Sequence, residues 1–143
     1  MEKTREYTTI MRPFWKSSLA LITALSPLVA GAAPINVPSG QPVEFHEVIW
    51  EEEGDLNIYR FRYITPQIAR DEGRINFEQA EADIKHLCES SALPVLIAQE
   101  RAVDKIIISI SDRKVAFGTP APEATQFFEV YSPDGTACIW EGF

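Results

Sequence analysis

The chain has 143 residues, which is enough for one domain and too few for a TIM barrel or a two-domain dinucleotide enzyme. Its 21 acidic residues outnumber 13 Lys and Arg, giving a formal net charge of −8 at pH 7. That balance argues against nucleic acid as a partner, because nucleic-acid binders need clustered cations to replace phosphate counterions. Hydrophobic residues make up 45% of the chain, which is typical of a globular protein.

The first 32 residues have the pattern of a cleavable secretion signal. Four Lys and Arg residues precede an uncharged, mainly apolar stretch over residues 17–33, and the Ala-Gly-Ala triplet at 30–32 supplies a small-residue cleavage site. We expect cleavage before Ala33, with Met11 as an alternative start to Met1. The competing interpretation is an uncleaved membrane anchor, but the apolar stretch is short for a hydrocarbon core. After cleavage we expect a soluble periplasmic protein without stable membrane insertion.

The rest of the chain divides into an extended arm over residues 33–41 and a single α+β domain over residues 42–143. Alternating residues from 42 to 50 predict a strand, and β-favouring residues from 56 to 64 predict a second. The polar segment 51–55 between them contains a glycine. The two strands therefore form a hairpin.

A hairpin that is symmetric about Glu53 and Gly54 sorts its side chains onto two faces, with Glu47 opposite Arg60. One face carries Phe45, Glu47, Ile49, Ile58, Arg60 and Arg62. The other, mainly aromatic, face carries His46, Val48, Trp50, Tyr59, Phe61 and Tyr63. The aromatic face is either the core beneath a helix or an exposed surface for a partner, and both interpretations stay open.

The pattern becomes helical after the break at Thr65 and Pro66. Asn76 and Gln79 form a capping pair, and apolar residues at spacings of three and four predict the main helix over residues 77–91. Charged residues cover the remaining surface of this helix. Pro94 then begins a second, short helix that ends near residue 102.

Three further strands complete the sheet. The β-branched run Lys105–Ser111 predicts a central strand. Residues 125–131 and 136–141 predict a second hairpin around a turn with Pro and Gly, and a short strand over residues 115–117 is optional. The order β-β-α-α-β-(β)-β-β predicts an antiparallel sheet of four to six strands, with the main helix and the short second helix packed on one face.

Cys88 and Cys138 predict one disulfide, because an even number of cysteines in an exported chain favours pairing. Two buried free thiols are the alternative. Cys88 lies on the apolar side of the main helix and Cys138 in the last strand. The bridge would therefore join the helix to the sheet.

No catalytic or metal site is indicated, and no cofactor is expected. His86 and Cys88 are two positions apart on a helix and point roughly 200° away from each other, so they cannot act together. The sequence contains no nucleophile elbow. The acidic segment 51–55 could attract calcium, but its spacing matches no EF-hand, and we favour a solvated turn.

Arginines cluster after the first hairpin. Four fall within fifteen residues of this acidic chain: Arg60, Arg62, Arg70 and Arg74. Such a group could hold a carboxylate or a phosphate. If it forms a site, Arg62, Arg70 and Arg74 should meet at one edge of the sheet. The favoured alternative is local ion pairing: Arg60 with Glu47 across the hairpin, and Arg70 and Arg74 with Asp71, Glu72 or the anions of the main helix.

Five short segments carry a likeness to known sequences: PSGQPV at 38–43, TPQIARD at 65–71, HLC at 86–88, ATQFFE at 124–129 and CIWEGF at 138–143. In these the chain resembles a small exported alphaproteobacterial family, of Rhodobacter type, that has no known function. The resemblance implies export and a single domain and supplies no catalytic residue. The label acetolactate synthase, attached to some members, does not suit this chain, because that enzyme is much larger and needs a thiamine cofactor domain.

The favoured function is a non-catalytic accessory or protein-interaction module, whose partner is an envelope protein or a small ligand. Its candidate binding residues are Arg62, Arg70, Arg74, His46, Tyr59, Phe61 and Tyr63. One alternative is a small envelope enzyme that uses His46 with nearby carboxylates. Another is a binder of a metal or small ligand that uses His46, Glu44 and the acidic segment, or the segment from Arg60 to Arg74.

Overall fold

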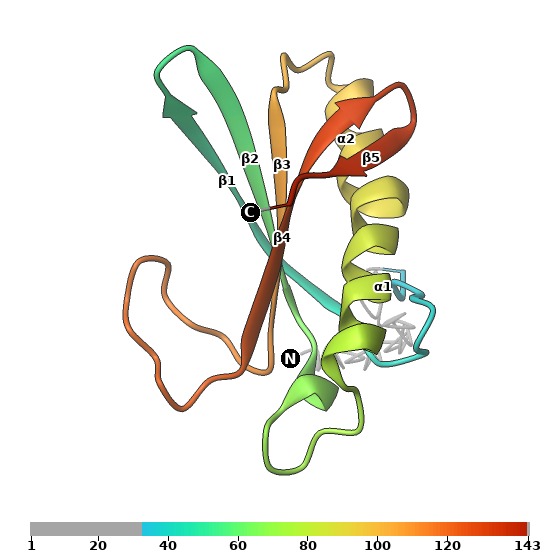
Figure 1. Ribbon diagram of the computed structural model, residues 1–143, viewed down its shortest axis with the longest axis vertical. Coiled ribbons are helices and arrows are strands. Elements are labelled where there is room, and N and C mark those ends of the chain that lie inside the picture. The colour runs from blue at the N-terminus through green and yellow to red at the C-terminus, as the bar shows by residue number, and fades with distance from the viewer. Residues whose placement is uncertain (1–32, 143) are drawn as a thin grey trace, which may run out of the picture. The chain divides into compact units, whose positions relative to one another are not determined.

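The computed structural model describes residues 33–142, so the predicted secretion signal lies outside the described residues. Five strands form one sheet in the order β1-β2-β3-β4-β5 (Figure 1). They are β1 (Glu44–Glu53), β2 (Leu56–Ile64), β3 (Lys105–Ser111), β4 (Gln126–Asp134) and β5 (Ala137–Trp140). The helical elements are the 3-10 turn η1 (Pro66–Ile68), α1 (Phe77–Leu87), the π-helical turn η2 (Cys88–Ala92) and α2 (Leu93–Ala98).

The predicted α+β class, with the helices on one face of the sheet, is confirmed. The sheet is mixed rather than wholly antiparallel, because β2 and β3 run parallel while the other three pairs are antiparallel. The segment from η1 to α2 connects these two strands. It leads from the end of β2 back to the end of the sheet where β2 began, so that β3 can run parallel to β2. The optional strand at residues 115–117 does not form, and these residues belong to the loop between β3 and β4.

The first hairpin is longer than predicted and its register differs by two residues. Glu47 lies opposite Arg62 rather than Arg60, because the acidic residues before Gly54 continue the strand and only two residues form the turn. Gly54 adopts a φ of +62°, which glycine tolerates best. A shift of two residues leaves the side chains on their predicted faces.

A β-bulge between Phe45 and Glu47 makes the one exception to the predicted faces. The bulge leaves His46 without a partner in the register and places Phe45 opposite Tyr63. The rings of Phe45 and Tyr63 meet edge to face at 5.8 Å. Phe45 therefore joins the aromatic side of the hairpin in place of His46.

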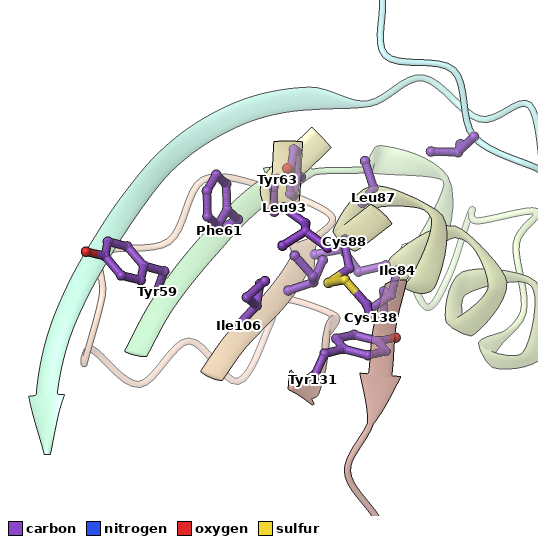
Figure 2. Packing of buried hydrophobic residues seen from close by; sticks show 14 of the residues in the cluster. Tyr59, Phe61, Tyr63, Ile84, Leu87, Cys88, Leu93, Ile106, Tyr131 and Cys138 are labelled. Carbon is purple, nitrogen blue, oxygen red and sulfur yellow. A yellow bond between two sulfur atoms is a disulfide. The ribbon is translucent and has the colours of Figure 1, made fainter. Parts of the chain in front are cut away.

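The core lies between this aromatic side and the helices (Figure 2). Its largest contributions come from β2, from alternate isoleucines of β3 and from the apolar side of α1, and they include Tyr59, Phe61, Tyr63, Ile106, Ile108, Ile110, Ile84 and Leu87. The open question of the aromatic face is thus settled for β2, whose aromatic residues are buried beneath the helices.

The helical segment begins with a capping box and continues through a π turn into α2. Asn76 and Gln79 form the predicted capping box, each side chain accepting from the other's backbone N–H. The π turn η2 joins α1 to α2 directly, and within it the N–H of Leu93 donates to the carbonyl of Cys88. Pro94, which follows this turn, has no N–H to donate to the helix. The segment ends at Ala98, four residues earlier than predicted.

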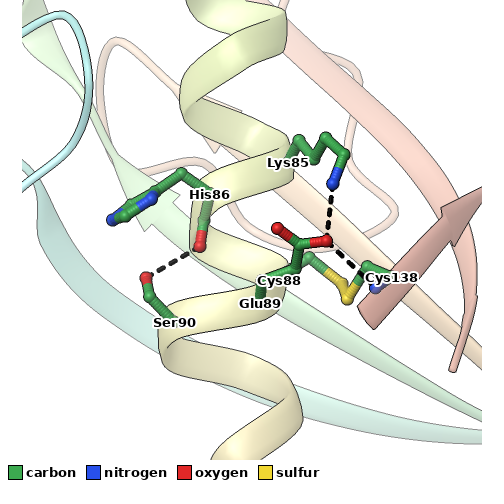
Figure 3. The surroundings of a disulfide bond; sticks show 6 residues. All are labelled: Lys85, His86, Cys88, Glu89, Ser90 and Cys138. Carbon is green, nitrogen blue, oxygen red and sulfur yellow. Dashed lines mark hydrogen bonds and ion pairs between the residues drawn. A yellow bond between two sulfur atoms is a disulfide. The ribbon is translucent and has the colours of Figure 1, made fainter. Parts of the chain in front are cut away.

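The disulfide between Cys88 and Cys138 is confirmed, and it joins the end of α1 to β5 (Figure 3). Both cysteines are buried. Beside them, Glu89 accepts hydrogen bonds from the ammonium of Lys85 and from the backbone N–H of Cys138. Figure 3 shows His86 on the side of the helix away from the disulfide, as its spacing from Cys88 predicts.

Candidate functional site

An apolar groove with a volume of about 590 Å³ lies between β1 and the α2 end of the helical segment. This volume is in the range of pockets that hold small molecules or side chains of a partner. The wall on the β1 side consists of Phe45, Val48 and Trp50, and the floor consists of Tyr59 and Phe61 of β2. The groove is therefore built on the aromatic side of the first hairpin.

The opposite wall comes from the helical segment. Val95 and Leu96 of α2 supply its apolar part, and Ser91 of the π turn lies among them. Gln99 and Arg101, just beyond α2, add polar groups, and Nε of Arg101 lies 3.4 Å from the Oε1 atom of Gln99. The groove combines a large apolar surface with a few polar groups, as binding pockets usually do.

The β1 wall is exposed because the helical segment lies mainly over β3 and β4 and does not extend over the edge strand β1. Trp50 is 54% exposed, and Phe45 and Val48 are more than two-fifths exposed. Large apolar side chains that are this exposed and adjacent are unusual on a protein surface without a partner. They distinguish this part of the aromatic side from the buried part beneath the helices.

Tyr63 lies below the groove and is fully buried. Its hydroxyl donates to Oγ of Ser91 at 2.9 Å. Burial raises the pKa of Tyr63 to about 12, and the hydrogen bond to Ser91 only partly opposes this effect. Tyr63 therefore stays neutral at physiological pH and holds the π turn against the sheet. Tyr59 and Phe61 line the groove, whereas Tyr63 supports it.

Arg60 and Arg62 lie on the sheet face opposite the helices, where they form local ion pairs. Arg62 is buried, and it pairs with Glu47 at 2.5 Å and donates to the backbone carbonyl of Val115 at 2.6 Å. Both guanidinium groups lie over the ring of Phe117. Arg60 pairs with Glu51 rather than with Glu47. Together the two arginines hold the β3–β4 loop against the sheet.

Arg70 and Arg74 lie elsewhere, beside the N-terminus of α1. They line one hollow of about 520 Å³ together, and Arg62 does not reach it. The structure thus brings two of the three predicted arginines to one place and separates the third. Within the described residues neither of the two forms an ion pair with the predicted partners Asp71 and Glu72.

His46 lies at the β-bulge, outside both the groove and the arginine-lined hollow. Its Nε2 atom is 3.6 Å from a carboxylate oxygen of Glu47, and that carboxylate is already bound by Arg62. Among residues 33–142 no group of three or more His, Cys, Asp or Glu is placed to hold a metal ion. No helix of the described part is long and apolar enough to span a membrane.

Several residues that line the groove are not predicted as binding residues from the sequence. Phe45 was assigned to the opposite face because the bulge leaves no clear signal in the sequence. Val95 and Leu96 have the apolar character of any helix that packs on a sheet, so only the extent of α2 shows that one side of it borders a groove. The signal that the sequence does offer is Trp50, which alternation places on the aromatic face of the hairpin.

The chain belongs to a family of unknown function (DUF6497), whose family model matches residues 20–143. This confirms the resemblance to a family without a known function. The comparisons with curated proteins and with solved structures give no match.

Proposed function

We propose that this member of the family is a non-catalytic binding module of the periplasm, which takes up an extended apolar segment of a partner protein in the groove between β1 and α2. The observation that carries the proposal is the row of half-exposed apolar side chains, Phe45, Val48 and Trp50, along the edge strand. The buried rings of Tyr59 and Phe61 give this row a rigid floor.

The position of β1 favours an extended segment. Within the five-stranded sheet of the described residues, β1 pairs with β2 alone, so its other edge presents backbone N–H and carbonyl groups. A partner segment can add to that edge as a further strand, with main-chain hydrogen bonds supplying affinity. Its alternate side chains would then enter the groove beside Val48 and Trp50.

Charge favours a basic partner over a second copy of this chain. Half of the ten residues of β1 are glutamates, and Glu52 and Glu53 have no ion-pair partner among the described residues. Two β1 strands paired together would bring like charges opposite each other, which destabilises a sheet. A segment with Lys or Arg near Glu52 and Glu53 would gain from the same charges.

We also propose that residues 1–32 direct export and are removed. The uncharged stretch over residues 17–33 and the small residues at 30–32 support this proposal, and so does a disulfide, which persists in oxidising compartments. N-terminal sequencing of the protein from its native cells should find a first residue at or near Ala33. An intact N-terminus on membrane-bound protein would contradict it.

Selection of random displayed peptides on the purified protein tests the binding function. We expect enriched peptides that alternate apolar and polar residues and carry Lys or Arg. Trp50→Ala should weaken their binding roughly tenfold or more, because a central aromatic contact contributes about 2 kcal/mol or more. The matched control is Phe128→Ala, which removes a similarly exposed aromatic ring outside the groove.

Three outcomes would contradict the proposal. The first is that no peptide family is enriched. The second is that Trp50→Ala and Phe128→Ala weaken binding equally. The third is that the groove takes a long-chain fatty acid in a Trp50-dependent manner while no peptide binds, which would make the module a small-ligand binder.

A further inference from the structure

The hollow lined by Arg70 and Arg74 lies beside the N-terminus of α1, whereas the groove lies beside α2. It is bordered by the residues that precede α1 and by the first residues of β4. No Asp or Glu lines it. In a chain with a formal net charge of −8, two arginines without an acidic neighbour in the same hollow create a locally positive place.

A tight loop brings these two arginines together. The backbone N–H groups of Arg74 and Ile75 both donate to the carbonyl of Gln67, at 2.8 and 3.0 Å. Gly73 donates to the carbonyl of Ala69, and a Cβ atom on Gly73 would lie only 2.2 Å from that oxygen. The loop therefore requires glycine at position 73. Its main-chain hydrogen bonds fix the backbone positions of Arg70 and Arg74.

Four nearby carboxylates, those of Asp71, Glu72, Asp112 and Glu123, line a separate hollow, which Arg70 also borders. Asp112 accepts two hydrogen bonds from the guanidinium of Arg113, which lower the pKa of Asp112, and the charge of Arg70 adds to that lowering. Neither Arg70 nor Arg74 has a carboxylate within 4.0 Å among the described residues. Both side chains are exposed, so they are available to an anion that enters the hollow.

The N-terminus of α1 adds donors to the same place. The capping box occupies the N–H groups of Asn76 and Gln79, and Ala80 donates to the carbonyl of Asn76. The first two helical N–H groups, those of Phe77 and Glu78, have no partner within the helix. The N-terminus of this 11-residue helix carries a partial positive charge that favours anions. Phe77 itself lines the hollow.

An unpaired buried hydroxyl also borders the hollow. Thr125 is only 7% exposed, yet its Oγ1 has no hydrogen-bond partner in the described part of the chain. A buried hydroxyl usually has a partner, because leaving it unpaired is unfavourable. Thr125 lines the hollow, so a bound acceptor would supply that partner.

We propose that this hollow binds the phosphate group of a phosphate ester. Two guanidinium groups match a dianion with several acceptor oxygens better than they match a carboxylate. The N-terminus of α1 and the hydroxyl of Thr125 add donors for the remaining oxygens. Phe77 and Phe127, whose rings meet edge to face at 5.2 Å, form an apolar wall beside the arginines for the organic part of the ligand.

Titration of the isotope-labelled protein, followed by amide NMR shifts, tests this site with phenyl phosphate, inorganic phosphate and phenylacetate as probes. Phenyl phosphate should shift the amide signals of Phe77, Glu78 and Thr125 and bind more tightly than the other two. Arg70→Ala and Arg74→Ala should each weaken binding roughly tenfold or more. Thr125→Val should weaken it as well. Lys114→Ala is the matched control, because Lys114 is an exposed cation outside the hollow.

The proposal is overturned if phenyl phosphate shifts none of these signals, or if phenylacetate binds as tightly as phenyl phosphate. It is also overturned if Lys114→Ala weakens binding as much as Arg74→Ala, because the effect would then be one of overall charge. Peptide binding in the groove should be the same in Arg74→Ala and wild type. Failure of the phosphate site and failure of the groove are therefore separate results.

Discussion

Asp83 shows how a single side chain fixes the N-terminal arm. The helical pattern places this aspartate among the charged residues of the main helix, yet it is fully buried. Its carboxylate accepts three hydrogen bonds: from the backbone N–H of Ser39 at 2.9 Å, from Oγ of Ser39 at 2.5 Å and from Nε2 of Gln41 at 2.6 Å. The predicted arm is therefore bound to α1 instead of being free.

Asp83→Asn should destabilise the protein by about 1–3 kcal/mol, because the new amide nitrogen meets donors and cannot accept from them. Urea unfolding measures the loss, and limited proteolysis should cut the arm faster in the variant. Glu81→Gln, on the exposed side of the same helix, is the control and should change stability little. Equal stabilities of Asp83→Asn and wild type would show that the arm is held by other contacts.

The stability of the folded protein should depend on the protonation of Glu89. The hydrogen bond from Lys85, followed by that from the backbone of Cys138, lowers the pKa of Glu89 from its ordinary value of 4.5. A carboxyl group whose pKa is lower in the folded state stabilises the protein above its unfolded-state pKa. That stabilisation is lost as the pH falls through the folded-state value.

Glu89→Gln should therefore be less stable than wild type at neutral pH, by at most about 1 kcal/mol because the side chain is partly exposed. The difference should shrink as the pH falls below 4.5. Urea unfolding at several pH values measures it, with Glu72→Gln as the control for an exposed carboxylate. A difference that grows toward acid would contradict this account.

At the scale of elements, the disulfide joins the end of α1 to β5, the strand at the far edge of the sheet from β1. It links residues 50 positions apart. In the chain-entropy account, a cross-link of that span restricts the unfolded chain and stabilises the fold by about 4 kcal/mol.

Replacing Cys88 and Cys138 together by Ala should lower the free energy of unfolding by several kcal/mol, on the order of 4 kcal/mol. Chemical unfolding of the variant and of the oxidised wild type gives the difference. Wild-type protein unfolded without reductant should show no reaction with thiol reagents. Two reactive thiols under that condition would contradict the bridge.

The elements that the sequence predicted well are those fixed by local chemistry. The capping box of Asn76 and Gln79 and the β-branched β3 depend on neighbouring residues, and the structure confirms them. Both hairpins have their glycine in the turn, but each turn has only two residues, because β1 continues to Glu53 and β4 continues through Pro133 to Asp134. The parallel pairing of β2 with β3 depends on the route of the intervening helices, which local patterns do not encode. The register of the first hairpin was missed because acidic residues favour a turn as much as an edge strand.

The candidate sites could be predicted less completely. Tyr59 and Phe61 of the groove and the pair Arg70 and Arg74 were singled out from residue type alone. Residue type does not show which arginines lie together: Arg62 pairs with Glu47 on the outer face of the sheet, whereas Arg70 and Arg74 line the hollow beside α1. The groove itself depends on how far α2 extends over the sheet, which no residue type reveals.

At the scale of the whole molecule, residues 33–142 of this acidic chain present an apolar groove and a hollow lined by Arg70 and Arg74, beside different parts of the helical segment. A basic, extended segment is complementary to the first, and a phosphate ester to the second. The negative charge should also speed encounter with a basic partner, and this effect should weaken as salt rises.

The salt dependence gives a prediction for the whole protein. The association rate of a basic groove-binding peptide should fall as the salt concentration rises, whereas its dissociation rate, which depends on apolar contacts, should change little. Stopped-flow fluorescence of a labelled peptide measures both rates. A dissociation rate that carries most of the salt effect would place the ionic contacts, and not the apolar ones, at the centre of the interface.

Hydrogen exchange along β1 is the most direct test of the groove as a strand-adding site. With a selected peptide bound, the amides of β1 on its unpaired edge should exchange more slowly, in alternation along residues 47–53, because every second N–H of an edge strand faces outward. The amides of the β3–β4 loop should be unaffected. Protection confined to that loop, or bound peptide without any protection of β1, would contradict the account.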